Sequence, residues 1–318
     1  MSRSVALTGA TGFIGWHVAR RFLDSGWHVR ALVRPESHRA VPGGVERVVA
    51  PLREADIVAA CAGVSVLVHL AGAVGHRTDA EFVHTNVEGT AEVARAARRL
   101  GIRLVHTSSL GATGPRSPQR PPDEDEALRP INAYGESKRR SEEIVKNLAG
   151  LDWTIVRPTL VYGPRDRLFL PPFKLARRGL FPIPNRTAEY NIVHVEDVAR
   201  GYEKVATLGA PGETFFLGAP HQVTIVTLLE CLATVFGRPF RPFTIPRIGL
   251  SAAATVGSWL SAAGIHAPIN RARYREIAAE GFVCRVDRAR DRLGFVATTD
   301  LQEGLKTTAE WYRAQGWL

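Results

Sequence analysis

The chain has 318 residues, of which 45% are hydrophobic and 23% are charged, with 29 glycines and 20 prolines. Such a composition is typical of a globular protein and excludes collagen-like, coiled-coil and wholly disordered chains. The formal net charge is +10, carried by 36 arginines and 5 lysines that are scattered along the chain without a basic run. We therefore expect no nucleic-acid partner and an acidic small ligand instead.

Strands and helices are predicted to alternate through the first half of the chain. Residues 4–7 form a short apolar run, a glycine-rich turn follows, and residues 14–23 carry apolar side chains at helical spacing. The same analysis predicts strands at 29–33, 66–70, 104–107 and 153–157, and helices at 56–61, 87–100 and 133–149. This alternation predicts an α/β fold, a Rossmann-type doubly wound parallel sheet covered by helices on both faces.

Prolines break this rhythm after residue 162, and a second region begins there. We expect residues 1–162 to form mainly the dinucleotide-binding domain and residues 163–318 mainly a smaller substrate-binding cap, with 190–218 returning to the Rossmann core. Predicted elements of the second region are strands at 190–194 and 214–217 and helices at 195–207 and 224–236. A cleft between the two regions is the expected ligand site.

The cysteines and the apolar segments indicate in which cellular compartment the protein works and whether it contacts a membrane. Cys61, Cys231 and Cys284 are far apart and form no CxxC pair, which indicates a reducing compartment, and no secretion signal is visible at the N-terminus. We expect a cytoplasmic protein. The charge-free residues 248–265 are interpreted as a buried or lid helix, so no membrane contact is expected, with peripheral contact through 248–265 left as an alternative.

The glycine-rich turn after the first strand has the spacing TGxxGxxG. Gly9 permits a tight turn, Gly12 lets the backbone approach a pyrophosphate, and Gly15 lets the following helix pack closely on the strand. A turn of this kind can also be purely structural. Its position between a strand and a helix favours the phosphate-binding interpretation.

The end of the second predicted strand bears on the choice of dinucleotide. Folds that prefer NAD usually place a carboxylate there, but Val33 occupies this position and Arg34 follows. A guanidinium would pair with a 2′-phosphate, so we expect NADP(H) to be favoured over NAD(H), with His38 or Arg39 as helpers. The alternative is that Arg34 merely ends the strand.

Tyr134 and Lys138 form a YxxxK pair on a predicted helix, and no other tyrosine of the chain has a lysine four residues later. This spacing puts both side chains on one helical face, where an ammonium would lower the pKa of a phenol toward the range of a general acid/base. Upstream, Ser108 and Ser109 follow a strand at its carboxyl end. Ser109 could polarise a substrate oxygen, or both hydroxyls could simply end the strand.

These motifs together resemble the extended short-chain dehydrogenases/reductases, the group that holds sugar-nucleotide epimerases and dehydratases, 3β-hydroxysteroid dehydrogenases and dihydroflavonol reductases. The resemblance covers essentially the whole chain. Further matching segments lie at residues 68–72, 86–90, 156–164 and 194–198.

The resemblance implies that Tyr134 exchanges the proton at the reacting carbonyl or alcohol, that Lys138 tunes Tyr134 and bonds the nicotinamide ribose, and that Ser109 bonds the substrate oxygen. Asn86 would shape the helix beside the site, and a homodimer is the implied assembly. The cofactor-binding residues that it implies are Gly9, Thr11, Gly12, Phe13, Ile14, Gly15, Arg34, Ala71, Asn86, Thr107, Tyr134, Lys138, Pro158, Leu160 and Val161.

Two departures from the family pattern affect the substrate prediction. Pro51 and Leu52 replace the usual Asp-Leu that contacts adenine, and Thr113 stands where the sugar-nucleotide branch usually has tyrosine. Residues 245–265 are apolar and rich in small residues, which suits a lid over an apolar ligand. We therefore expect an NADP(H)-dependent oxidoreductase that interconverts a carbonyl and a secondary alcohol on a largely apolar small molecule.

Two alternatives remain open. One is a nucleotide-sugar epimerase or dehydratase with tightly held NAD(P), in which Arg165, Arg167, Arg177, Arg178 or Arg186 grips a diphosphate. The other is a catalytically silent dinucleotide-binding or assembly protein. The histidines show no metal-ligand spacing, so no metal is expected.

Overall fold

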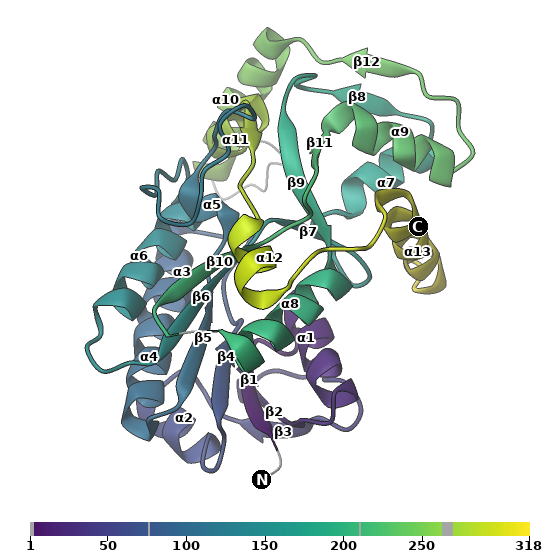
Figure 1. Cartoon of the computed structure of the whole chain (residues 1–318). Helices are drawn as coiled ribbons and strands as arrows, with labels where there is room; N and C mark the ends of the chain where they lie inside the picture. The colour runs from purple at the N-terminus through teal and green to yellow at the C-terminus, as the bar shows by residue number, and fades with distance from the viewer. Residues whose placement is uncertain (1–2, 76, 210, 263–269) are drawn as a thin grey trace.

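A seven-stranded parallel sheet forms the centre of the molecule in the computed structural model, which describes residues 3–75, 77–209, 211–262 and 270–318 (Figure 1). The strand order is β10-β6-β5-β4-β1-β2-β3, and every pairing is parallel. The predicted Rossmann-type sheet is confirmed. The strands are β1 (Ser4–Thr8), β2 (His28–Val33), β3 (Glu46–Val49), β4 (Val66–His69), β5 (Arg103–Thr107), β6 (Trp153–Pro158) and β10 (Glu213–Leu217).

Helices cover both faces of this sheet, because successive side chains of each buried strand point to opposite faces. In β1, Val5 and Leu7 join one hydrophobic core, whereas Ala6 joins the core on the other face. The first core is closed by α1 (Phe13–Asp24), α8 (Val195–Leu208) and α12 (Asp287–Leu293), and the second by α2 (Glu54–Ala60), α4 (Gly89–Leu100) and α6 (Ala133–Asn147).

Some short elements were not predicted. β3 is an edge strand whose side chains are largely exposed, so it lacks the apolar run that marks the others. The helix expected from residue 87 is preceded by α3 (Asp79–Phe82) and by a π-helical turn, Val83–Glu88, which carries the buried side chain of Asn86. The four-residue helix α5 (Leu110–Thr113) is too short to show a period.

The remaining elements form a cap over the carboxyl ends of the strands (Figure 1). Its own apolar core includes Phe173, Phe181, Leu232 and Tyr312. The strands of the cap are β7 (Leu160–Tyr162), β8 (Phe181–Ile183), β9 (Glu189–His194), β11 (Gln222–Thr224), β12 (Pro242–Thr244) and β13 (Gly281–Phe282), and its helices are α7 (Leu170–Arg177), α9 (Ile225–Val235), α10 (Arg247–Ala262), α11 (Arg271–Ala278) and α13 (Leu301–Ala314).

Residues 248–265 were predicted to form a buried or lid helix, and 263–265 lie outside the described residues. For the rest, the prediction of burial was wrong, whereas the lid stays a prediction. Helix α10 forms there, but its larger apolar side chains are exposed, Ile248 by 86% and Trp259 by 71%. Small residues, Ala254 among them, occupy its inner face, and this allows α10 to pack on α11. Within the described residues no helix is both long and apolar enough to cross a bilayer.

Replacing Gly15 by alanine should lower the free energy of unfolding by about 2–3 kcal/mol. A Cβ at this position would lie 2.2 Å from the backbone oxygen of Gly9, so α1 would have to move away from β1. Chemical denaturation of Gly15→Ala against Gly43→Ala measures the effect. A Cβ at Gly43 meets nothing within 4 Å, and equal stability of the two variants would contradict the account of this packing.

Candidate active site

The glycine-rich turn lies where β1 and β4 end. Gly9 has a φ of +76°, and a Cβ there would come within 2.5 Å of the backbone nitrogen of Ala71, so only glycine fits this close approach of two chain segments. The backbone N–H of Gly12 donates to the Gly9 oxygen at 2.9 Å, and the N–H of Ala71 donates to Thr8 Oγ1 at 3.1 Å. The turn is therefore built rigidly against the end of β4.

The geometry of this turn fits a pyrophosphate. Helix α1 begins at Phe13 without a side-chain cap and without an acidic residue in its first turn, so its N-terminal amides and dipole are available to an anion. A Cβ on Gly12 would meet only the Gly9 oxygen, at 3.2 Å, and its other side is open. Phe13 and Ile14 supply the first amides of the helix, and Thr11 lies in the same turn.

Arg34 lies one residue beyond β2, at the same edge of the sheet as this turn, because Leu32 pairs with Thr8. Its side chain is 71% exposed and its Nε lies 3.3 Å from Glu36 Oε1. The following loop is held by Arg47, which donates to the backbone oxygens of Ser37 and Arg39. An exposed guanidinium at this edge is free to turn toward a bound dinucleotide.

Ser109 and Tyr134 lie side by side at the end of β5. Ser109 caps α5 by accepting from the Gly111 N–H at 3.0 Å, and its hydroxyl is near enough to that of Tyr134 to lower the pKa of Tyr134. A Cβ on Gly111 would lie 3.3 Å from Ser109 Oγ and 3.4 Å from Tyr134 Cε1, so the absence of a side chain there lets the two approach. The two hydroxyls can therefore reach a common substrate oxygen.

Lys138 lies one turn further along α6 and is buried. Its Nζ donates to the backbone oxygen of Thr107 at 2.9 Å. A Cβ on Gly72 would lie 3.2 Å from both Lys138 Nζ and Asn86 Oδ1, which shows how tightly these groups converge. Asn86 in turn accepts from the Ala73 N–H at 2.7 Å. Burial lowers the pKa of Lys138 to about 8, against the opposing effect of the Glu142 carboxylate.

The pKa of Tyr134 moves in the direction opposite to the expected one. Burial raises it, the hydrogen bond with Ser109 lowers it, and the Glu276 carboxylate on α11 raises it further, with a net rise. The Lys138 ammonium, which was expected to lower the pKa of Tyr134, donates to the Thr107 backbone oxygen. Tyr134 is therefore a neutral phenol at neutral pH, ready to donate a proton.

Ser108, in contrast to Ser109, points away from the site into a buried ionic cluster. Its Oγ donates to Glu142 Oε1 at 2.6 Å, and the same carboxylate accepts from Arg157 Nε at 2.8 Å and Nη2 at 2.7 Å. This cluster joins α6 to β6. Sequence reasoning missed Glu142, although its position four residues after Lys138 places it on the same helical face.

Two histidines lie beneath the site. His69 hydrogen-bonds Thr8 Oγ1 at 2.7 Å and Thr90 Oγ1 at 3.1 Å, and its ring stacks on that of His106 with centroids 5.6 Å apart. Burial and then the nearby Lys138 charge lower the pKa of His69 to about 3. Both rings are therefore neutral packing groups, and neither is suited to proton transfer near pH 7.

The segment expected beside the nicotinamide runs along the same edge of the sheet. Pro158 ends β6, and Leu160 and Val161 belong to β7, where the Leu160 side chain is 38% exposed. The Thr159 hydroxyl is buried without a hydrogen-bond partner among the described residues. Thr107 completes this edge, since its Oγ1 accepts from the Tyr202 hydroxyl at 2.8 Å.

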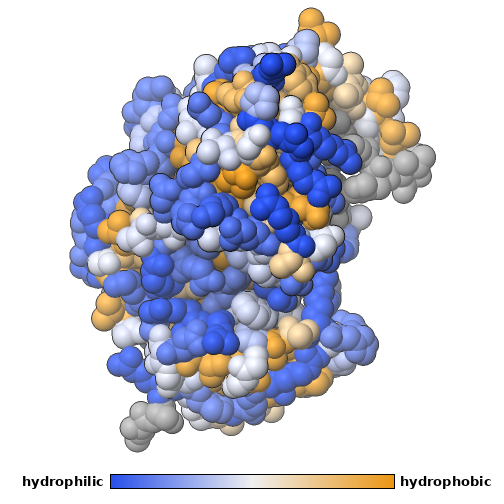
Figure 2. Space-filling model, turned by 90° about the vertical axis from the view of Figure 1, so that its right-hand side faces the viewer, coloured by the Kyte–Doolittle hydropathy of each residue, from blue (hydrophilic) through white to orange (hydrophobic). Residues whose placement is uncertain are grey.

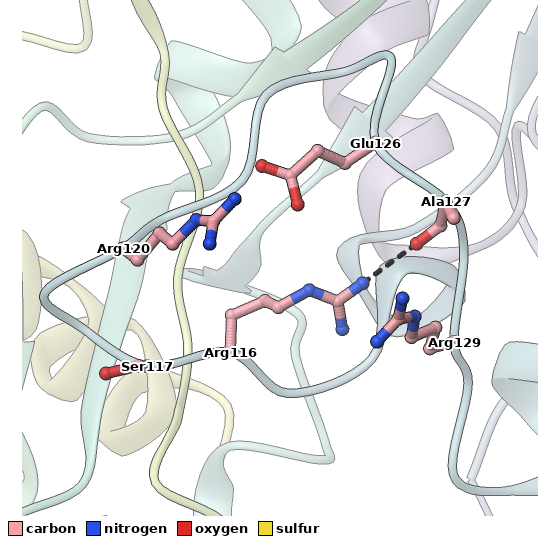
Figure 3. A pocket seen from close by; sticks show the side chains of 6 residues that line it. All are labelled: Arg116, Ser117, Arg120, Glu126, Ala127 and Arg129. Atoms are coloured by element: carbon pink, nitrogen blue, oxygen red, sulfur yellow. Dashed lines mark hydrogen bonds between the residues drawn. The ribbon is translucent and has the colours of Figure 1, made fainter.

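A separate hollow of about 270 Å³ lies in the loop that precedes α6. Figure 3 shows the guanidinium of Arg116 within it, between Arg120 and Arg129 and facing Glu126, and donating to the Ala127 oxygen at 2.8 Å. Burial, and then the neighbouring Arg129, lower the pKa of Arg116. This polar hollow contains none of the residues predicted to be catalytic, so it is not the reaction site.

A family model described as the NAD dependent epimerase/dehydratase family matches residues 5–218. These residues hold the glycine-rich turn, Ser109, Tyr134 and Lys138. The chain belongs to this family. As a member of the NAD dependent epimerase/dehydratase family it is an NAD(P)-dependent enzyme of the extended short-chain dehydrogenase/reductase type, as the motifs predicted.

Relatives of this family member differ in their substrates. The chain is 32% identical to a ceramide reductase from Caulobacter vibrioides, over 99% of this chain and 96% of the relative. It is 30% identical to a 4-hydroxy-2-methyl-3-oxo-4-farnesyl-3,4-dihydroquinoline-1-oxide ketoreductase from Stigmatella aurantiaca, over 94% and 93%. A solved structure, MoeE5 in complex with UDP-glucuronic acid and NAD, superposes with a TM-score of 0.77 at 25% identity, over 98% and 99% of the two chains.

The pH dependence of stability tests the burial of Lys138. The native side chain loses its proton near pH 8 and the unfolded one near 10.5, so the unfolded state binds more protons between these values and stability rises with pH there. As the pH rises through this window, the free energy of unfolding of the wild type should increase by about 3 kcal/mol relative to that of Lys138→Met.

Denaturant unfolding at a series of pH values measures this difference. Lys306→Met, which removes an exposed lysine on α13, is the control and should follow the wild type. A Lys138→Met profile parallel to that of the wild type would contradict the depressed pKa.

Proposed function

We propose that the protein is an NADP(H)-dependent reductase that converts a carbonyl of a largely apolar small molecule to a secondary alcohol, with Tyr134 as the general acid. The observation that carries this proposal is the convergence of Ser109 and Tyr134 at Gly111, beside the buried Lys138. All three lie at the carboxyl edge of the sheet, where the glycine-rich turn also lies.

The proton transfer follows from the positions of the side chains. Bound NADPH supplies the hydride that the carbonyl carbon accepts. Ser109 donates a hydrogen bond to the carbonyl oxygen, and Tyr134 donates its proton to that oxygen as the carbon–oxygen double bond becomes a single bond. Solvent then returns a proton to Tyr134. Lys138 holds the cofactor ribose and favours the transient phenolate through its positive charge.

With its raised pKa, Tyr134 is a neutral phenol at neutral pH, which is compatible with a role as proton donor. A neutral phenol is the form that donates a proton, whereas oxidation of an alcohol needs the phenolate as base. Burial, together with the Glu276 carboxylate from α11, raises this pKa despite the hydrogen bond from Ser109. The cap therefore helps to keep Tyr134 protonated.

The nucleotide-sugar alternative would need several of five arginines to bind a diphosphate together. Their positions favour an apolar substrate instead. Arg165 and Arg167 lie over the rings of Trp16 and Trp317, at 4.5 and 4.4 Å from their centroids. Arg186 is hydrogen-bonded to Thr244 on β12, at 3.2 Å. The other two, Arg177 and Arg178, are exposed at the end of α7. These five side chains do not form one anion-binding cluster.

The names of the two sequence relatives support the same substrate class, because ceramide and a farnesyl-bearing quinoline oxide are apolar molecules. The rival function is that of a nucleotide-sugar epimerase or dehydratase, and the likeness to MoeE5 with its bound UDP-glucuronic acid favours it. Incubation with NADPH and panels of long-chain ketones and sugar nucleotides separates the two. Consumption of NADPH with a ketone supports the proposal, and turnover of a sugar nucleotide without net NADPH consumption contradicts it.

We extend the proposal to location and assembly. The three cysteines are free thiols, which supports a reducing compartment and hence the cytoplasm. A homodimer is the assembly that the family resemblance implies.

Tyr134→Phe should lower kcat by a factor of about 10²–10⁴, because the variant has no proton to donate to the carbonyl oxygen. Its Kd for NADPH should stay within about twofold of the wild-type value, since the ring is retained. Tyr190→Phe, which changes a tyrosine on β9, is the control. Full activity of Tyr134→Phe would exclude Tyr134 as the acid.

Arg34→Ala should weaken NADPH binding by roughly tenfold to a hundredfold while leaving the Kd for NADH nearly unchanged, because a charged hydrogen bond to the 2′-phosphate is lost. Fluorescence titration with both dinucleotides measures the two values. Arg53→Ala removes an exposed arginine just before α2 and is the control. An equal loss for NADPH and NADH would show that Arg34 does not read the 2′-phosphate.

A further inference from the structure

Helix α10 exposes a face that carries no polar side chain. At 100° per residue, the exposed residues between 248 and 260 fall within one stripe, and the half-buried or buried residues between them fall on the opposite side. The stripe consists of Ile248, Gly249, Ala252, Ala253, Val256, Trp259 and Leu260. Trp259 is 71% exposed and Val256 52% exposed.

The sequence around this stripe carries arginines and no acidic residues. The sequence from residue 231 to residue 275 holds no aspartate or glutamate and six arginines. Of these, Arg241, Arg247, Arg271 and Arg275 are exposed and form no ion pair within the described part of the chain. Hydrophobic residues gather over the upper part of the molecule in Figure 2, the part formed by the cap.

This combination fits a membrane surface better than a protein partner. A protein interface carries about one hydrogen bond per 100–200 Å², whereas the Trp259 indole nitrogen is the one polar side-chain atom of the stripe. An exposed apolar helical face that includes tryptophan, in a segment with arginines and no acidic residues, is the pattern of helices that lie in the interface of an anionic bilayer.

We propose that α10 docks the protein onto a bilayer of anionic lipid, with the stripe in the acyl boundary and the positive charge of the surrounding segment attracting the headgroups. With 16 residues from Arg247 to Ala262, α10 is too short to span a bilayer, so the proposed contact is with the bilayer surface. The inference stands on exposure and charge and is independent of the proposed reductase activity.

The docking helix is connected to the candidate active site. Ser258 Oγ on α10 accepts from the Arg271 N–H at 2.9 Å, which ties α10 to the start of α11. On α11, Glu276 is hydrogen-bonded to Asn132, the residue that caps the catalytic helix α6. If the proposed function holds, an apolar substrate dissolved in the bilayer would meet the protein at α10. Only α11 then separates α10 from α6, the helix that carries Tyr134.

Vesicle flotation tests the docking without reference to activity. The purified full chain is floated at physiological ionic strength with vesicles of phosphatidylcholine and phosphatidylglycerol, and with vesicles of phosphatidylcholine alone. We expect flotation with the mixed vesicles and roughly tenfold less with the neutral ones. No flotation with the mixed vesicles, or equal flotation with both, would overturn the proposal.

Two pairs of variants locate the contact. Val256→Ser with Trp259→Ser removes apolar contact, and Arg247→Gln with Arg271→Gln removes charge; each pair should lower flotation roughly tenfold. The matched controls are Val49→Ser with Leu208→Ser, 59% and 58% exposed elsewhere on the surface, and Arg53→Gln with Arg98→Gln. A control pair that lowers flotation as much as its test pair would show nonspecific attraction and overturn the proposal.

Ala253→Glu provides a further variant, since it adds a carboxylate to an exposed position of the stripe and should also abolish flotation. Light scattering measures the molar mass of the wild type and of the variant that combines Val256→Ser with Trp259→Ser. It tests whether a second copy of the chain covers the stripe. A wild-type dimer that becomes a monomer in this pair, together with no flotation of the wild type, would assign the stripe to self-association and overturn the proposal.

Discussion

The burial of the Lys138 ammonium is the constraint on which the arrangement of the site depends. A buried charge needs acceptors, and the Thr107 backbone oxygen at the end of β5 provides one at 2.9 Å. This hydrogen bond constrains the rotation of α6 about its own axis and its distance from the end of β5. Tyr134, one helical turn earlier, is thereby placed beside Ser109 at the same strand end.

A second buried contact holds α6 from the other side. Glu142, one turn after Lys138, bonds Arg157 on β6 and the hydroxyl of Ser108. A buried ion pair adds little net stability because both groups lose their hydration, but removal of one partner leaves an unpaired charge. This cluster also accounts for the different positions of the adjacent serines, since Ser108 is held by Glu142 whereas Ser109 caps α5 beside Tyr134.

The sequence was sufficient for the parts of the site that depend on local spacing. The glycine spacing predicted the turn at Gly9, and the four-residue interval between Tyr134 and Lys138 predicted that both lie on one face of a helix. What could not be predicted depends on residues distant in the chain. Tyr134 was expected to have a lowered pKa, and its pKa is raised by burial and by Glu276, which comes from α11.

The exposed face of α10 was missed for a related reason. Its apolar composition predicted burial, because a helix with few polar residues normally enters a core. The packing of α10 on α11 uses small residues such as Ala254 and leaves Ile248 and Trp259 outside. Composition alone does not distinguish an apolar helical face that packs in the protein core from one that is exposed and could contact lipid.

The central claim is that the chain reduces a carbonyl with a hydride from the dinucleotide and a proton from Tyr134. Turnover of a ketone with NADPH that carries deuterium at both C4 positions of the dihydronicotinamide, followed by mass spectrometry of the product, tests the hydride transfer. The account predicts one deuterium on the carbinol carbon of each product molecule and one NADP⁺ formed per product. A product that carries no deuterium, or turnover without net formation of NADP⁺, would contradict it.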